Sequence, residues 1–277
     1  MRHYSILEYA QFRWFKLSVA LAAAASAAYL WYEPPIEPYG GTWLGYTLGT
    51  MGALLILWLL WFGVRKRSYR SNAASVQGWL SAHVYLGTAL VVVTTLHTGF
   101  RMGWNIHTLA YVLMLLVVAS GFYGVFVYLR VPGMMTENLG EESLQSILLR
   151  IADIDREMGE KALSLPDDLF ALVARSAKET RLGGSLWRLV SGRDPSCATA
   201  AAVREWPALA RRLKGDVAKL DKEVFEMLLR KRGLLERARR DLRYKALLDL
   251  WLYVHVPLAF ALLAALVAHV VSVFVYW

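Results

Sequence analysis

Four of the six histidines in this chain stand at intervals that suit metal binding. His83 and His97 are 14 residues apart, and His255 and His269 repeat that interval. Fourteen residues make just under four helical turns, so both members of a pair lie on nearly the same helix face, about 21 Å apart. Imidazole is the commonest metal ligand among side chains. The spacing therefore predicts two metal centres at two depths of a helical bundle.

The cysteine content limits the kind of redox centre that these histidines could serve. Cys197 is the single cysteine, so an intrachain disulfide and an iron–sulfur cluster are both excluded. No Cys-x-x-Cys-His motif occurs, so a haem cannot be attached covalently. Any redox cofactor must be held by histidine or by non-covalent contacts.

The elements that carry the histidines are long and apolar. The chain has 277 residues, 57% of them hydrophobic, and a helix needs about 20 apolar residues to cross a bilayer. Five segments meet this length: 17–32, 44–64, 79–100, 107–129 and 248–276. The basic residues before the first segment are also typical of a secretory signal, but we interpret this segment as a retained transmembrane helix. The sequence thus predicts an all-α integral membrane protein with five transmembrane helices.

Basic residues at the segment ends predict the orientation of the chain. Three lie within residues 2–16 and four within 65–70, whereas the loop 33–38 has none and the loop after the third segment has only Arg101. Because cytoplasmic loops are rich in Lys and Arg, we expect a multi-pass inner (cytoplasmic) membrane protein with a cytoplasmic N-terminus and an outer C-terminus. This distribution also explains the net charge of +9 without nucleic acid.

The orientation predicts which histidines pair. The third and fifth segments both run outward, so His83 should face His255 near the inner side and His97 should face His269 near the outer side. Each pair would ligate the iron of one haem b, giving two haems in one helix bundle. Six-coordinate irons of this kind carry electrons and do not activate oxygen.

Three further residues are candidate neighbours of these cofactors. Gly87, one turn after His83, would let a porphyrin lie against the helix backbone. Arg101, one turn after His97, could pair with a haem propionate or serve as an ordinary interfacial anchor. His107 could orient a ligand, contact a quinone head group or make an interfacial hydrogen bond. No catalytic residue is assigned.

A charged segment, 131–247, is predicted to form a helical cytoplasmic insertion between 1–130, which holds the first four transmembrane helices, and 248–277, which holds the fifth. Pro132 and Gly133 predict a break after the fourth helix. Apolar residues at helical spacing predict two helices, near 144–158 and 213–234, that pair as an antiparallel hairpin. No phosphate-binding motif occurs, so we interpret the insertion as a scaffold or docking platform.

The runs 83–101 and 120–124 resemble the haem-bearing helices of dihaem membrane cytochromes b, and 251–269 is similar in the same way. This group includes respiratory cytochrome b and the ferric-reductase-like transmembrane proteins. The resemblance covers 79–130 and 248–276, and it implies haem b ligation by the four histidines and electron transfer across the membrane. Flavin and nicotinamide domains and a Pro-Glu-Trp-Tyr quinol segment have no counterpart here, so the resemblance supports the cofactor more firmly than a reaction.

The sequence therefore predicts an electron-transfer subunit of a membrane redox complex rather than a complete enzyme. A cytochrome or an iron–sulfur protein is the expected partner on one or both faces of the bilayer, and exchange with quinone is left open. Two alternatives remain. One is a self-sufficient quinol dehydrogenase or metal reductase, and the other is a non-redox membrane scaffold or sensor with structural histidines.

Overall fold

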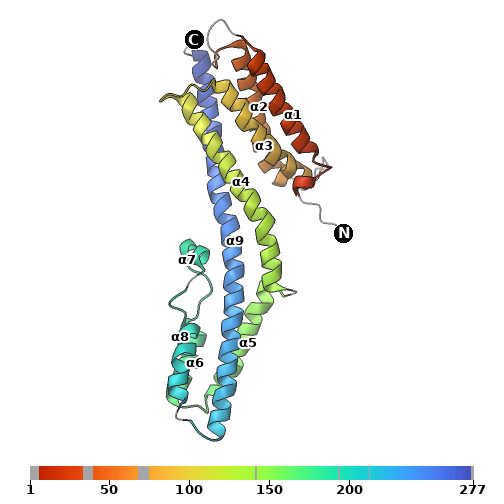
Figure 1. Ribbon diagram of the computed structural model, residues 1–277. Helices are drawn as coiled ribbons and strands as arrows, with labels where there is room; N and C mark the ends of the chain where they lie inside the picture. Colours follow the sequence, from red (N-terminus) through yellow and green to blue (C-terminus); the bar gives the residue numbers. More distant parts are fainter. Residues whose placement is uncertain are drawn as a thin grey trace. The chain divides into compact units, whose positions relative to one another are not determined.

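The computed structural model describes residues 6–33, 40–67, 75–140, 142–192, 194–211 and 213–275. The predictions that rest on Arg2, Arg70 and loop residues 34–38 lie outside the described residues, as do the side chains of Lys66 and Arg67 at the end of α2. The described elements are all helical, as predicted (Figure 1). They are η1 (Ile6–Glu8), α1 (Arg13–Trp31), α2 (Trp43–Arg67), α3 (Val76–Thr98), α4 (Ile106–Leu139), α5 (Leu144–Ala162), α6 (Asp167–Glu179), α7 (Leu186–Ser191), α8 (Ala198–Ala210) and α9 (Asp216–Val275).

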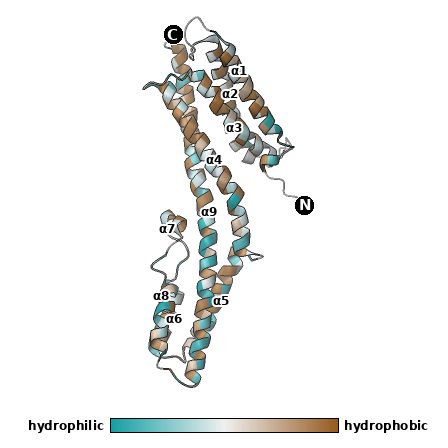
Figure 2. Cartoon of the chain, viewed as in Figure 1, coloured by the Kyte–Doolittle hydropathy of each residue, from teal (hydrophilic) through white to brown (hydrophobic). Residues whose placement is uncertain are grey.

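Five of these helices are long and apolar enough to cross a membrane, namely α1, α2, α3, α4 and α9. Each of them overlaps one of the five predicted segments, which confirms the five candidate spans, although α4 and α9 extend well beyond the segments predicted for them. Figure 2 shows hydrophobic residues along α1, α2 and α3, and a mixed, more hydrophilic pattern along α5. Large apolar side chains such as Leu30, Leu54 and Phe260 are more than half exposed, which is expected of a surface that faces lipid.

The chain divides into two compact units. Unit 1 comprises residues 1–126 and 251–277, and unit 2 comprises residues 127–250. Both α4 and α9 contribute to each unit. All four predicted ligand histidines belong to unit 1.

In unit 1, α3 is the central helix of the N-terminal part. Both α1 and α2 pack against it, and the Ser18 hydroxyl of α1 donates a hydrogen bond to the Tyr85 carbonyl of α3 (2.7 Å). A buried apolar cluster joins α3 to three other helices, through Ile56, Leu90, Met114 and Leu262. Because this cluster includes α9, the two histidine-bearing helices share one core.

Unit 2 contains the predicted antiparallel hairpin. Ile147 and Ile151 of α5 share a core with Leu234 and Leu235 of α9, while Met158, further along α5, packs with residues near 224–228, earlier in α9. Because residues further along α5 contact residues earlier in α9, the two helices run antiparallel. Glycine and proline residues between the hairpin helices predict turns and short helices, and α6, α7 and α8 occupy that stretch.

A buried ion pair holds α5, α6 and α9 together. The side chain of Lys231 is 1% exposed, and its ammonium donates to the Asp155 carboxylate (2.6 Å) and to both the carbonyl and the hydroxyl of Ser176. Burial lowers the pKa of Lys231, and Asp155 opposes that shift. All three donor sites of the ammonium thus have acceptors on two other helices.

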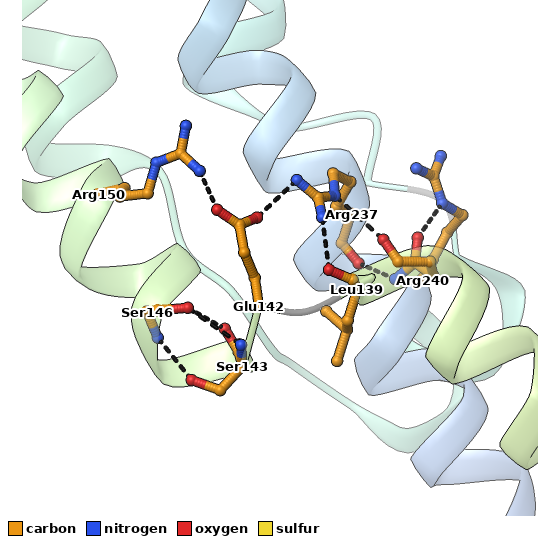
Figure 3. A network of polar contacts seen from close by, with 8 residues as sticks. Leu139, Glu142, Ser143, Ser146, Arg150, Arg237 and Arg240 are labelled. Atoms are coloured by element: carbon orange, nitrogen blue, oxygen red, sulfur yellow. Dashed lines mark hydrogen bonds and ion pairs between the residues drawn. The ribbon is translucent and has the colours of Figure 1, made fainter.

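The turn between α4 and α5 is fastened to α9 by the network in Figure 3. The Arg237 guanidinium of α9 donates to the last carbonyls of α4, at Asn138 and Leu139, which have no partner within their own helix. Glu142 accepts from both Arg237 and Arg150. Ser143 then begins α5 with a reciprocal capping box to Ser146.

Two local predictions are wrong. The break expected at Pro132 and Gly133 does not occur, because α4 continues to Leu139. A proline removes the hydrogen bond to the carbonyl four residues earlier but need not end a helix, and Pro132 lies inside α4. The end of α4 comes at Leu139, where Arg237 bonds the last carbonyls. Leu213, expected in the second insertion helix, precedes α9, which begins at Asp216 and continues without interruption to Val275.

Candidate functional site

The structure brings the four predicted histidines together in two pairs. The ring centres of His83 and His255 are 6.5 Å apart, and those of His97 and His269 are 6.0 Å apart. The pairing is the one expected from parallel helices, with the first histidine of α3 opposite the first of α9. With 14 residues between the members on each helix, the two pairs are about 21 Å apart along α3.

The backbone of α2 holds the His97 ring. Its Nδ1 lies 2.8 Å from the Gly45 carbonyl oxygen, which can only accept, so Nδ1 carries the proton. A Cβ added at Gly49 would lie 2.6 Å from His97 Cε1, which is too close for a real contact. The imidazole therefore lies directly against the helix backbone, and its Nε2 is the nitrogen left to bind another group.

Residues in one turn of α4 position the His255 ring. Its Nδ1 lies 2.7 Å from the Ser120 hydroxyl, which is also 2.7 Å from the Val117 carbonyl. Because the hydroxyl donates its one proton to that carbonyl, it accepts the Nδ1 proton of His255. Trp251, one turn earlier in α9, donates from its indole to the Ser120 carbonyl (2.9 Å). A Cβ at Gly124 would be 2.1 Å from that indole, so only glycine fits there.

His269 has an imidazole as its Nδ1 partner. Nδ1 of His107, at the start of α4, lies 2.5 Å from Nδ1 of His269, and the two rings are nearly perpendicular. Of the roles considered for His107 from the sequence, the structure thus places it in a hydrogen bond to a candidate ligand. When His269 is the donor in this hydrogen bond, its Nε2, like that of His97 and His255, is unprotonated and left to bind another group.

His83 differs from the other three histidines. Its Nδ1 is buried and has no hydrogen-bond partner among the described residues. The Phe62 ring of α2 packs beside it, with ring centres 5.2 Å apart. The backbone of Leu59, on α2, hydrogen-bonds the His83 ring, while the buried Nδ1 without a partner costs about 1–3 kcal/mol.

The two predicted neighbours of the cofactors occupy open positions. A Cβ added at Gly87 would meet no atom within 4 Å, so space is free beside this turn of α3. Arg101 is exposed in the loop after α3, where its backbone N–H donates to the Thr98 carbonyl. Their proposed contacts with a porphyrin stay predictions.

Ser120, Trp251, Gly45 and Gly49 are the site residues whose roles sequence reasoning did not assign. Gly45 and Gly49 form a Gly-x-x-x-Gly pattern on a membrane helix. This pattern is typical of close helix approach and could have indicated the contact between α2 and His97. Ser120 and Gly124 have the same interval as Trp251 and His255. That match becomes informative only once α4 and α9 are known to be neighbours.

The histidine pairs among the described residues would suit a cofactor whose own atoms supply most of the ligands to its metal. No group of three or more His, Cys, Asp or Glu side chains in this part of the chain could hold a metal ion. A haem needs only two axial ligands from the protein, which is what each histidine pair offers. No family model matches the chain, and neither a curated protein nor a solved structure is significantly similar to it.

Proposed function

We propose that unit 1 is the core of a membrane b-type cytochrome. His83 and His255 would ligate one haem b, and His97 and His269 a second, so that the chain carries electrons across the membrane as a subunit of a redox complex. The observation that carries the proposal is the Nδ1 hydrogen bonding of His97 and His255, combined with the spacing of the two pairs.

The spacing supports a metal between the members of each pair. A metal–imidazole bond is about 2 Å long and the ring centre lies about 1 Å beyond the nitrogen, so two axial imidazoles have centres about 6 Å apart. The two observed separations, 6.0 and 6.5 Å, agree with this value. Histidines that only hydrogen-bond each other come closer, as His107 and His269 do at 4.6 Å between ring centres.

The hydrogen bonds support the same assignment. Metal-binding histidines almost always donate their second ring N–H to a carbonyl, carboxylate or similar acceptor, which fixes the tautomer and the ring orientation. Gly45 provides such an acceptor for His97, and Ser120 provides one for His255. These contacts leave Nε2 of both rings unprotonated and able to donate a lone pair to a metal.

Each haem b would be held by the two histidines of its pair and would supply a one-electron centre. The protein residues would fix the two centres at different depths, one near each end of α3. The chain would then need a donor and an acceptor on its two sides, for which a cytochrome, an iron–sulfur protein or quinone is the expected class. Unit 2 would serve as the docking platform on one side.

The proposal is tested by counting haem in the purified full-length chain. A pyridine haemochrome assay should give two b haems per chain in the wild type. His83→Ala and His97→Ala should each lose one haem, and the remaining haem should differ in reduction potential between the two variants. Each variant thereby serves as the control for the other. Folded wild-type protein without haem would overturn the proposal and favour the membrane scaffold or sensor.

A further inference from the structure

An exposed apolar and basic surface of unit 2 lies on and around the short helix α7. Trp187 is 80% exposed and Leu186 is 44% exposed, although both are large apolar side chains. The flanking residues Arg181 and Arg188 are exposed as well, and residues 181–193 contain no acidic residue. A surface of this composition resembles an interfacial membrane contact, in which Trp sits at the headgroup level and Arg beside anionic lipid.

The position of α7 within unit 2 is fixed at both ends by α9. Leu182, before α7, packs into the apolar cluster that contains Leu234 and Ala238. After α7, Asp194 accepts a hydrogen bond from Arg239 (2.7 Å). A Cβ at Gly192 would lie 3.2 Å from Arg243 Cδ. From its start to its end, the segment therefore advances along α9 from the level of Leu234 and Ala238 to that of Arg243.

This position is close to the point where the apolar run of α9 begins. Asp249 is the last charged residue of α9, and the apolar run begins at Leu250. Arg243 precedes Leu250 by seven residues, or about 10 Å of helix. The headgroup layer on each side of the hydrocarbon core is about 5–8 Å thick, so the end of α7 lies at or beside it.

The charges of α9 beside α7 favour anionic lipid. Arg240, Arg243 and Lys245 are exposed there, whereas Asp241 is buried and Asp194 is paired with Arg239. Basic residues near a membrane surface are attracted to anionic lipid headgroups. We propose that α7, through Leu186 and Trp187 and the surrounding arginines, docks on the anionic headgroup surface of the same bilayer that α9 spans.

The test is the depth of a fluorophore attached beside Trp187 in the full-length chain. Cys197 is buried and is the single cysteine, so Cys197→Ala gives a background without native thiols. Leu186→Cys and Leu163→Cys, each labelled with an environment-sensitive fluorophore, form a matched pair of exposed leucines. Leu163 follows Lys161, which bonds Glu223 of α9, about 40 Å before Leu250.

In nanodiscs of phosphatidylglycerol and phosphatidylcholine with nitroxide-labelled lipids, the label at 186 should be quenched several-fold more strongly than the label at 163. The quenching at 186 should weaken when phosphatidylglycerol is omitted and when Trp187→Ser is added. Equal quenching at the two positions would overturn the docking, and quenching at 186 that ignores phosphatidylglycerol would overturn the anionic partner. These outcomes do not depend on haem, so they are independent of the proposed function.

Discussion

At the residue scale, the Nδ1 atoms of three candidate ligand histidines have three different partners. His97 donates to a backbone carbonyl, His255 to the Ser120 hydroxyl, and His269 lies beside the imidazole of His107. The fourth, His83, has none among the described residues. Since the hydrogen bond to a ligand tunes its basicity, two haems held by these pairs would differ in potential, as a directional electron path requires.

The Ser120 hydroxyl is expected to act as a positioning group for His255. Ser120→Ala removes the acceptor for the Nδ1 proton but leaves the carbonyl that binds Trp251. Haem affinity at the His83–His255 pair should fall about 10- to 100-fold, the usual effect of losing such a partner. Haem dissociation kinetics and the electron paramagnetic resonance spectrum would measure it, and Ser120→Thr should restore both. An alanine variant identical to wild type would contradict this role.

A methyl group at Gly49 should displace His97. The added Cβ of Gly49→Ala would lie 2.6 Å from Cε1 of the ring, so the imidazole must move, at a cost of about 1–3 kcal/mol. We expect loss of one of two haems with the other retained. Gly63→Ala on the same helix is the control, because its Cβ would meet nothing within 4 Å. Equal haem content in the two variants would argue against close packing at Gly49.

At this scale the sequence indicates the histidines but not the residues that hold them. Their equal intervals, together with the expected parallel direction of the two apolar segments, were enough to predict which rings meet. The Gly45 carbonyl has no side-chain signature, and Ser120 is an ordinary helix residue until α9 is placed beside α4. Contacts between helices depend on their rotation and tilt, which a single hydropathy pattern does not define.

At the element scale, α9 combines two environments in a single helix of 60 residues. Its first half packs against α5 and carries Lys231 and Arg237, and its last part carries His255 and His269. From the sequence we predicted both parts but placed a domain boundary between them, because the composition changes there from charged to apolar. The helical spacing of the residues continues across this point. A helix has no intrinsic reason to end where its surroundings change from water to lipid.

Asp241 of α9 is expected to make the stability of the protein depend on pH. Burial raises the pKa of its carboxyl above 3.8, an effect that the nearby Lys245 ammonium only partly opposes, and its Oδ1 has no hydrogen-bond partner among the described residues. The folded protein therefore binds this proton more tightly than the unfolded chain. The resulting stability is fully present below pH 3.8 and is lost as pH rises through the raised value.

The Asp241→Asn variant should thus gain stability relative to wild type as pH rises from about 4 to about 7. Thermal unfolding of both proteins in the same detergent at the two pH values would measure the change. Asp216→Asn is the control, since that carboxylate is 99% exposed. A Tm difference between Asp241→Asn and wild type that stays constant over this range would contradict the expected protonation.

At the scale of the whole molecule, five candidate spans place alternate connections on opposite sides of a bilayer. The connection between α3 and α4 and the insertion between α4 and α9 are separated by one span. Their opposite locations follow from the count of spans alone, whereas which side is cytoplasmic rests on the distribution of basic residues.

Labelling with a membrane-impermeant maleimide should separate these two connections. In the Cys197→Ala background, Met102→Cys lies in the α3–α4 connection and Leu163→Cys in unit 2, and both positions are more than half exposed. Intact spheroplasts should react at 102 only, and inverted vesicles at 163 only. The reverse result would invert the orientation, and reaction of both residues from one side would contradict five spans.

The distribution of the paired histidines along the chain has a consequence for biosynthesis. The members of each pair are 172 residues apart, and the second member always comes from the last part of α9. At about 5–20 residues per second, the ribosome makes that part on the order of ten to thirty seconds after α3. Under the proposed function, neither site can close around its cofactor before then. Haem insertion would be a late step of assembly, and a chain cut short before His255 would reach the membrane unable to complete either site.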